Sequence, residues 1–260
     1  PLNTAYTLDE VVIQAVRGND DRPSTRKVIS KKEIEGVYIG QDALYVIDKL
    51  SPSIITYSES GTNVTNYGLM RLRGIDQSRM NITLDGTPLN DMIDQGVFFS
   101  NFTDFTNSME SIQIERGVGT STNGTASYAG SVDFQSIDLR NRPAEAQLQI
   151  SGGSFGTYRG TVELTSGTVG KAFNFYTRFT KIHSDGYRYH SGTDSYSFFF
   201  SGGYFGEKDM VTLKGFTGQS QNGLAYLPVA LSDIEEDPRT NYVNENDIDN
   251  FGQDFIQLQY

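Results

Sequence analysis

The second half of the chain alternates apolar and polar residues, and this pattern limits the fold more than any other feature of the sequence. After "RNRP" at 140–143, six stretches place apolar side chains at every second position, as at Phe173, Phe175 and Phe179. A period of two residues is that of a β-strand whose two faces meet different surroundings. We therefore expect six successive antiparallel strands, with no helix among them.

The connections between these strands differ in length. A tight turn is expected at 206–209, whereas 218–250 is a long polar excursion that contains "DIEEDPRTNYVNENDIDN". Short turns at one end and long loops at the other are typical of an outer-membrane barrel. The alternation alone fits a soluble antiparallel sheet equally well. The recurrence of Phe, Tyr and Leu on one face favours the membrane interpretation.

The residues before Arg140 mix helical and strand signals. The capping-box spacing of "SKKE" at 30–33 and the apolar spacing at 41–50, which ends before Pro52, predict two short helices. Short apolar runs between Gly and Asn turns predict strands at 53–57, 69–73, 80–84, 111–115 and 131–135. We expect a small α+β domain.

Composition excludes several classes of function. A net charge of -11 argues against nucleic acid as a partner, because phosphates require a clustered basic face. The chain has no Cys for a thiolate metal site, and no apolar run reaches the length of a membrane-spanning helix. The glycine-rich segment 117–130 lacks the spacing of a phosphate loop, and His183 and His190 lie in a loop without a nucleophile. We expect no enzyme activity, no cofactor and no metal site.

Five segments carry a resemblance to one family. The segment "MRLRGIDQSRMNITLDGTPLND" at 70–91 resembles the plug domain of TonB-dependent outer-membrane transporters. In the family's order, "TLDEVVIQA" at 7–15 resembles the TonB box, 114–134 the second Arg-Gly element, "SGGSFGTYRG" at 151–160 the first barrel hairpin and "SDGYR" at 184–188 an early strand end. The glycine-rich form is similar to the siderophore, haem and cobalamin branch, in a Bacteroidetes-like variant, and differs from the starch-utilisation transporters.

The resemblance implies a fold and a division of the chain. The fold is an α+β plug domain followed by antiparallel strands of a 22-stranded transmembrane β-barrel, of which this chain holds an incomplete part. The implied divisions are 1–18 for the TonB box and N-terminal extension, 19–141 for the plug, and 142–260 for about six barrel strands.

The resemblance also implies a function, namely TonB-dependent active transport of a scarce nutrient across the outer membrane of a Gram-negative bacterium. The nutrient would be an iron-siderophore, haem, cobalamin or a similar small molecule or metal chelate. The implied partners are TonB, outer-membrane lipid and a surface lipoprotein. Two alternatives stay open: a soluble or secreted β-rich ligand-binding module, and a signal-transducing outer-membrane receptor. TonB would bind a short β-branched strand made of Leu8, Asp9, Glu10, Val11, Val12 and Ile13.

Within the plug, three groups of residues are expected to matter. Arginines can tie the plug to acidic residues of the barrel wall, and the candidates are Arg71, Arg73 and Arg116. Turns that need positive φ or close backbone approach are expected at Gly74, Asp85, Gly86 and Gly117. The plug connections 57–67 and 90–101 are expected to face the external loops 183–194 and 218–250, and the ligand candidates are Tyr57, Tyr67, Phe98, Phe99 and Asn101.

Overall fold

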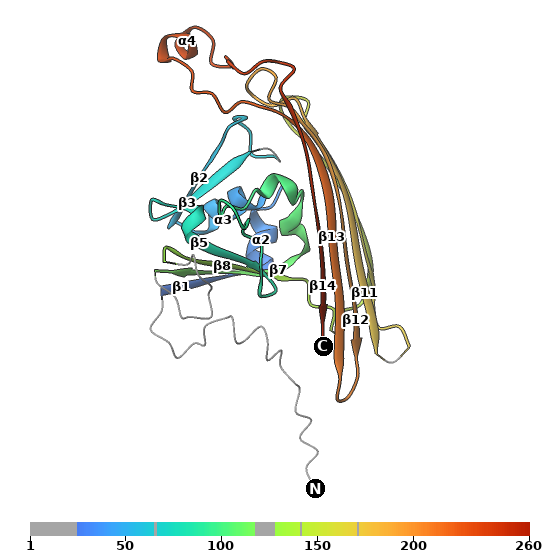
Figure 1. Ribbon diagram of the computed structural model, residues 1–260. Coiled ribbons are helices and arrows are strands. Elements are labelled where there is room, and N and C mark those ends of the chain that lie inside the picture. Colours follow the sequence, from blue (N-terminus) through green and yellow to red (C-terminus); the bar gives the residue numbers. More distant parts are fainter. Residues whose placement is uncertain (1–24, 65–66, 118–127, 141, 171) are drawn as a thin grey trace.

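The chain folds into a curved antiparallel sheet and an α+β domain that lies against its concave face (Figure 1). This is a computed structural model, and it describes residues 25–64, 67–117, 128–140, 142–170 and 172–260. Within these residues, every helix is too short or too polar to span a lipid bilayer.

The curved sheet confirms the six predicted strands. They follow one another in space as they do in sequence, each antiparallel to the next: β9 (Ala144–Gly152), β10 (Tyr158–Ser166), β11 (Phe173–Ser184), β12 (Thr193–Phe205), β13 (Met210–Gly223) and β14 (Ile248–Gln259). The tight turn 206–209 joins β12 and β13, where Gly206 N donates to Asp209 O at 2.9 Å.

The two faces of this sheet have opposite character. On β11 the outward side chains of Phe173 and Phe179 are 48% and 49% exposed, whereas the inward Tyr176 and Arg178 are buried. Leu148 on β9 is 70% exposed on the same outer face. A soluble sandwich would bury its apolar face and expose its polar face. This sheet does the reverse, which is the arrangement of a strand with a lipid-facing side and a covered polar side.

The α+β domain contains two small sheets. The larger has the order β1 (Thr25–Ser30), β7 (Met109–Arg116), β8 (Gly130–Ser136), β5 (Met80–Leu84) and β6 (Thr87–Pro88), in which only β5 and β8 are parallel. The smaller consists of β2 (Ile54–Ser58), β3 (Gly68–Leu72) and β4 (Ile75–Asp76). Apolar side chains of both sheets and of the helices form one core, among them Ile47, Leu72, Ile82, Val132 and Phe134.

The two predicted helices are confirmed. Helix α2 (Lys31–Val37) begins with the capping box, in which Ser30 N donates to Glu33 Oε2 at 2.8 Å and Ser30 Oγ accepts from Glu33 N at 3.4 Å. Helix α3 (Ala43–Leu50) is capped by the buried Asp42, so it starts two residues later than expected. The described part of the chain also forms three short 3₁₀ segments: η1 (Gln77–Arg79), η2 (Phe99–Asn101) and η3 (Phe105–Ser108).

Two expectations need correction, and one strand was missed. The segment 218–250 is not all loop, because β13 continues to Gly223, β14 begins at Ile248, and the connection 224–247 contains the unexpected helix α4 (Leu231–Glu236). Likewise β11 and β12 include 183–184 and 193–194, which leaves a loop at 185–192. Strand β1 was missed because its sequence has little apolar alternation. It lies at the edge of its sheet, where Val28 is 47% exposed and Ile29 is buried.

Candidate functional site

The contact between the α+β domain and the curved sheet centres on one carboxylate. Asp104 lies in the turn between η2 and η3, with a left-handed backbone (φ 58°) that Asp adopts more readily than most residues. This turn aims its fully buried side chain at strands β10 and β11. The sequence gives no local sign of this role, because an Asp in a polar turn usually lies in solvent.

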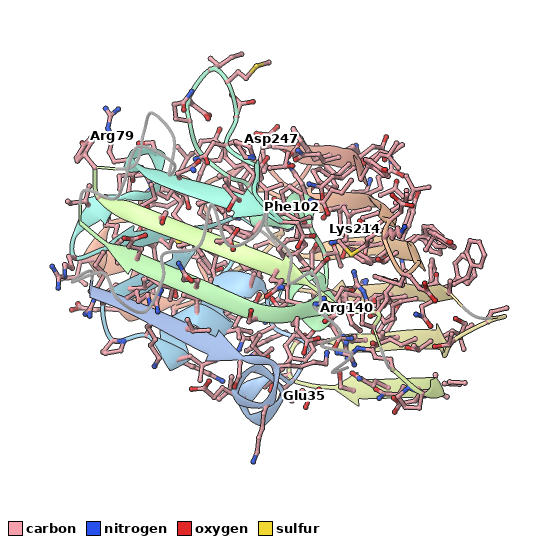
Figure 2. The ribbon with its side chains drawn as sticks, turned by 90° about the horizontal axis from the view of Figure 1, so that it is seen from below. Glu35, Arg79, Phe102, Arg140, Lys214 and Asp247 are labelled. Carbon is pink, nitrogen blue, oxygen red and sulfur yellow. The ribbon has the colours of Figure 1, made fainter. Side chains whose placement is uncertain are left out.

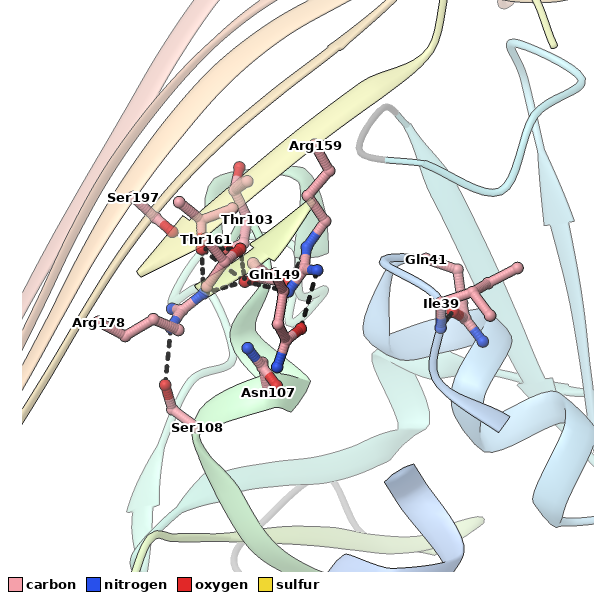
Figure 3. Close-up of polar contacts among 12 residues, drawn as sticks. Ile39, Gln41, Thr103, Asn107, Ser108, Gln149, Arg159, Thr161, Arg178 and Ser197 are labelled. Carbon is pink, nitrogen blue, oxygen red and sulfur yellow. Dashed lines mark hydrogen bonds and ion pairs between the residues drawn. The ribbon is translucent and has the colours of Figure 1, made fainter. Parts of the chain in front are cut away.

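Donors from the sheet surround Asp104, and Figure 3 labels Arg159, Thr161 and Arg178 among them. Arg159 Nε donates to Asp104 Oδ1 at 3.0 Å and Arg159 Nη2 to Oδ2 at 2.9 Å, while Arg178 Nη1 lies 2.8 Å from Oδ2. The hydroxyls of Thr161 and Thr180 also donate to Oδ2, at 3.2 and 2.5 Å. Burial acts to raise the pKa of Asp104, but the charges of Arg178 and Arg159 outweigh it and hold the pKa below its usual value. The carboxylate is therefore charged and paired.

Further hydrogen bonds extend this contact to neighbouring strands. Arg178 Nε donates to Ser108 Oγ at 2.8 Å, and Ser197 Oγ of β12 donates to Thr103 O at 2.7 Å (Figure 3). Asn107 Nδ2 donates to Glu163 Oε1 at 2.5 Å. The η2–η3 region is thus attached to β10, β11 and β12 at once.

A second ion pair lies near the turn between β5 and β6. Lys214 Nζ of β13 donates to Asp85 Oδ2 at 2.9 Å, and Ser136 N donates to Asp85 Oδ1 at 3.0 Å. Gln257 Nε2 of β14 adds a bond to Thr87 Oγ1 at 2.8 Å. Figure 2 shows Lys214 at the boundary between the domain and the sheet. Lys214 and Asp85 are both buried, so this pair also holds the two parts together.

Aromatic side chains fill the space between the two ion pairs. The ring of Phe216 on β13 lies 5.6 Å from that of Phe102 and 6.2 Å from that of Phe105. All three are almost completely buried, and Phe102 is labelled at this boundary in Figure 2. This part of the interface is packed with buried aromatic rings, as a domain core is.

At the end of the sheet where the long connections lie, the loop 185–192 binds the α+β domain. Ser60 O, in the turn between β2 and β3, accepts from the backbone N–H groups of Tyr187 and Arg188 at 3.2 Å each. Arg188 also reaches the connection 224–247, where Nε donates to Thr240 O at 3.2 Å and Nη2 to Leu227 O at 3.3 Å. One arginine therefore joins three segments above the domain.

Comparisons with known proteins agree with this architecture. The sequence model of the TonB-dependent receptor plug domain matches residues 19–131. Residues 19–131 are a TonB-dependent receptor plug domain. The domain that lies inside the curved sheet is therefore the plug, and β9–β14 are wall strands of the same fold. A search of curated protein sequences gave no match.

Solved structures share the fold at low sequence identity. The ferric-catecholate import receptor Fiu of E. coli, in its closed form, matches with a TM-score of 0.72 and 18% identity over 96% of this chain and 36% of its own. FpvA of P. aeruginosa bound to a heterologous pyoverdine and iron matches with a TM-score of 0.70 and 10% identity over 92% and 31%. The ferric yersiniabactin uptake receptor FyuA of Yersinia pestis matches with a TM-score of 0.66 and 12% identity over 90% and 37%. The chain spans about a third of the length of these relatives.

In the observed ion pairs between plug and wall, the charges are on the opposite partners from those predicted. In the described residues the plug supplies the carboxylates of Asp104 and Asp85, and the wall supplies the cations. Arg71 on β3 and Arg73 just after it are exposed, and Arg116 is the last residue of β7. Strand β3 lies on the side of the plug away from β9–β14 (Figure 1). Their pairing with acidic wall residues stays a prediction. The cations of the wall were missed because Arg and Lys at polar positions of an alternating strand fit a solvated face equally well.

The predicted turns have the backbone that was expected of them. The φ angles are 83° at Gly74, 80° at Gly86 and 87° at Gly117, and Asp85 itself has φ 47°. Besides its turn, Asp85 has the buried partner Lys214, which the sequence did not reveal.

The predicted ligand residues fall into two groups. Tyr67 lies edge-on to Phe98 with ring centroids 5.9 Å apart, and its hydroxyl donates to the Asp249 carboxylate on β14. Tyr57 is 44% exposed on β2. Ligand contact by Tyr57, Tyr67 and Phe98 stays a prediction.

The second group is buried. Phe99 is 1% exposed, with its ring 5.9 Å from that of Phe134 in the plug core, so ligand contact by Phe99 does not fit this arrangement. Asn101 is 5% exposed, and its Nδ2 donates to Gln253 Oε1 of β14 at 3.4 Å. The expected TonB box at 8–13 lies outside the described residues. Among the residues that are described, no three His, Asp or Glu side chains are grouped so that they could hold a metal ion.

Proposed function

We propose that this protein is an outer-membrane receptor that takes up a scarce nutrient in a TonB-dependent manner. The observation that carries the proposal is the plug domain fixed by buried ion pairs to a sheet whose outer face is apolar and exposed. A plug in a barrel lumen blocks free diffusion, so uptake requires an input of work. The same arrangement argues against a soluble binding module, because such a module would bury the apolar face of its sheet. A soluble module would also need no detergent for solubility or purification.

TonB is the proposed source of that work, through strand addition at 8–13. Replacing Val12 by Pro removes a backbone donor and fixes φ, so strand addition should fail while ligand binding at the cell surface persists. Val12→Thr is the matched control, because it keeps the donor and the β-branched side chain. We expect binding without uptake for Val12→Pro and normal uptake for Val12→Thr. Unchanged uptake by Val12→Pro would refute the assignment of this segment to TonB.

The proposed ligand site lies under the loops, at Tyr57, Tyr67 and Phe98. Flat aromatic surface beside hydroxyl and amide groups suits a polar ligand with apolar parts. Iron chelates are the first candidates, because the matched structures named above are receptors for ferric compounds; haem and cobalamin come next. A growth and binding assay with these three classes would identify the ligand. Phe98→Ala should then weaken its binding at least threefold, and Phe99→Ala, which changes the plug core, serves as the comparison.

The remaining parts of the proposal concern location and chemistry. The apolar outer face of β9–β14 supports residence in the outer membrane, and detergent-dependent solubility of the full-length protein would test it. Transport through such a receptor requires no bond making, so the proposal includes no catalytic activity. The matches described above name no surface lipoprotein, and the proposal includes none.

A further inference from the structure

The outer face of the wall is not evenly covered by large side chains. On β9, Leu148 and Ile150 occupy outward positions, whereas the outward positions nearer the start of the strand hold Ala144 and Ala146. A groove of about 860 Å³ opens at this step in side-chain size and extends across β10 and β11 to β12. A volume of this size falls within the range of small-molecule sites.

Two aromatic rings from neighbouring strands form one side of the groove. Phe175 of β11 and Phe200 of β12 both line it, with ring centroids 6.4 Å apart and 29° between the ring planes. Gly202 is paired with Phe175 in the ladder, and a Cβ at this position would lie 2.9 Å from Phe200 Cζ and 3.1 Å from Phe175 Cδ1. The glycine therefore lets both rings lie close to the backbone, and the shape of this side of the groove depends on it.

The character of the groove changes along the strands. Three polar residues, Glu145, Thr165 and Ser166, line it where β9 begins and β10 ends. Farther toward the middle of the strands, Leu164 and Phe198 line it with apolar surface. A lipid has the same division, because its apolar acyl chains are attached to a polar glycerol and headgroup.

From this shape and polarity we infer that the groove binds an acyl chain of one phospholipid. The inference rests on the proposed residence in the outer membrane and adds a lipid site on the wall. The groove is continuous with the apolar outer face of β9–β14, so its occupant comes from the bilayer. Its polar end lies at the end of the sheet that carries the tight turn 206–209, opposite α4 (Figure 1). Short turns of such barrels face the periplasm, so the occupant belongs to the periplasmic leaflet and is a phospholipid and not lipopolysaccharide.

The outward positions of β9 supply a matched test. Ala146→Trp fills the groove, whereas Ile150→Trp places the same side chain on the same face of β9 but outside the groove. The full-length protein is reconstituted in vesicles of phosphatidylethanolamine and phosphatidylglycerol, with and without lipopolysaccharide, and is extracted again in mild detergent. Native mass spectrometry then measures the lipid that stays bound. We expect wild type and Ile150→Trp to retain one phospholipid per protein, and Ala146→Trp to retain at least fivefold less.

Each other outcome overturns a stated part. A wild-type protein that retains no lipid, or equal retention by all three proteins, would refute the site and leave the proposed function intact. Equal loss in both variants would show a general effect of Trp on the outer face and would also refute the site. Retained lipopolysaccharide in place of phospholipid would refute the periplasmic leaflet as its source. If the full-length protein is soluble without detergent, the proposed location fails and the site with it. If Ala146→Trp does not assemble, the smaller change Ala146→Leu is measured in its place against Ile150→Leu.

Discussion

Replacing Asp104 by Asn removes one negative charge and little volume from the centre of the plug–wall contact. Both arginines that it binds are buried, with Arg159 at 5% exposure and Arg178 at 0%. Loss of one partner of a buried ion pair destabilises by roughly 3–5 kcal/mol, because the remaining charge has no counterion. Here two cations would remain, and Gln149 Oε1, which accepts from Arg159 at 3.1 Å, compensates only one of them. We therefore expect about 4 kcal/mol, close to a thousandfold in the equilibrium between attached and detached plug.

Hydrogen exchange of the full-length protein in detergent measures this equilibrium. The opening constant for the peptide 99–108, corrected for intrinsic exchange, should rise about a thousandfold in Asp104→Asn. Asp48→Asn is the control, because Asp48 is exposed on α3. The pKa of Asp104 is held below its usual value, so its contribution is complete above the usual Asp pKa and lost only as the pH falls through that lowered value. A rise of less than tenfold in Asp104→Asn, or an equal rise in the control, would show that these charges do not hold the plug.

Three further predictions follow from other contacts. Lys214→Met should destabilise plug attachment by about 3 kcal/mol, measured by the same exchange, because the buried Asp85 loses its cation; an unchanged opening constant would contradict this. Burial raises the pKa of Asp42 to about 7, so its favourable protonated form is lost as the pH rises through that value, and denaturant unfolding should show the plug about 1 kcal/mol less stable at pH 8 than at pH 6. The Asn variant at this position, which keeps the cap, should abolish this difference. Arg188→Gln should increase protease cleavage of the connection between β13 and β14 at least fivefold in whole cells, because several carbonyls lose their common donor, whereas Lys208→Gln at the opposite end of the sheet should not.

Features encoded by neighbouring residues could be predicted from the sequence. The capping box at Ser30 and the two-residue period of Phe173, Phe175 and Phe179 each depend on residues a few positions apart, and the structure confirms the elements that they predict. The period also separates two faces of each strand. The period does not show whether the polar face is covered by protein or by water. Arg178 in "FYTRFT" would fit a solvent-exposed face as well as a buried ion pair.

The ion pairs could not be predicted for this reason. Asp104 lies more than fifty positions before Arg159 and more than seventy before Arg178, and a single sequence contains no measure of that distance in space. The same limit applies to Phe98 and Phe99, which are neighbours in the sequence and were both ligand candidates. The structure places Phe99 in the core and leaves Phe98 half-buried beside Tyr67. The 3₁₀ turn that begins at Phe99 determines which of the two side chains points inward.

The opposite faces of the wall strands place different demands on mutation. An outward position such as Phe179 or Leu148 has only to remain apolar, so many side chains would serve there at little cost. An inward position such as Arg178 must match a particular group on another part of the chain, and it can change only together with that group. Neighbouring positions of one strand should therefore accumulate amino-acid substitutions at different rates. Over long divergence this leaves a fold in which half of each strand is free to vary, which is compatible with relatives that keep the architecture at 10% to 18% identity.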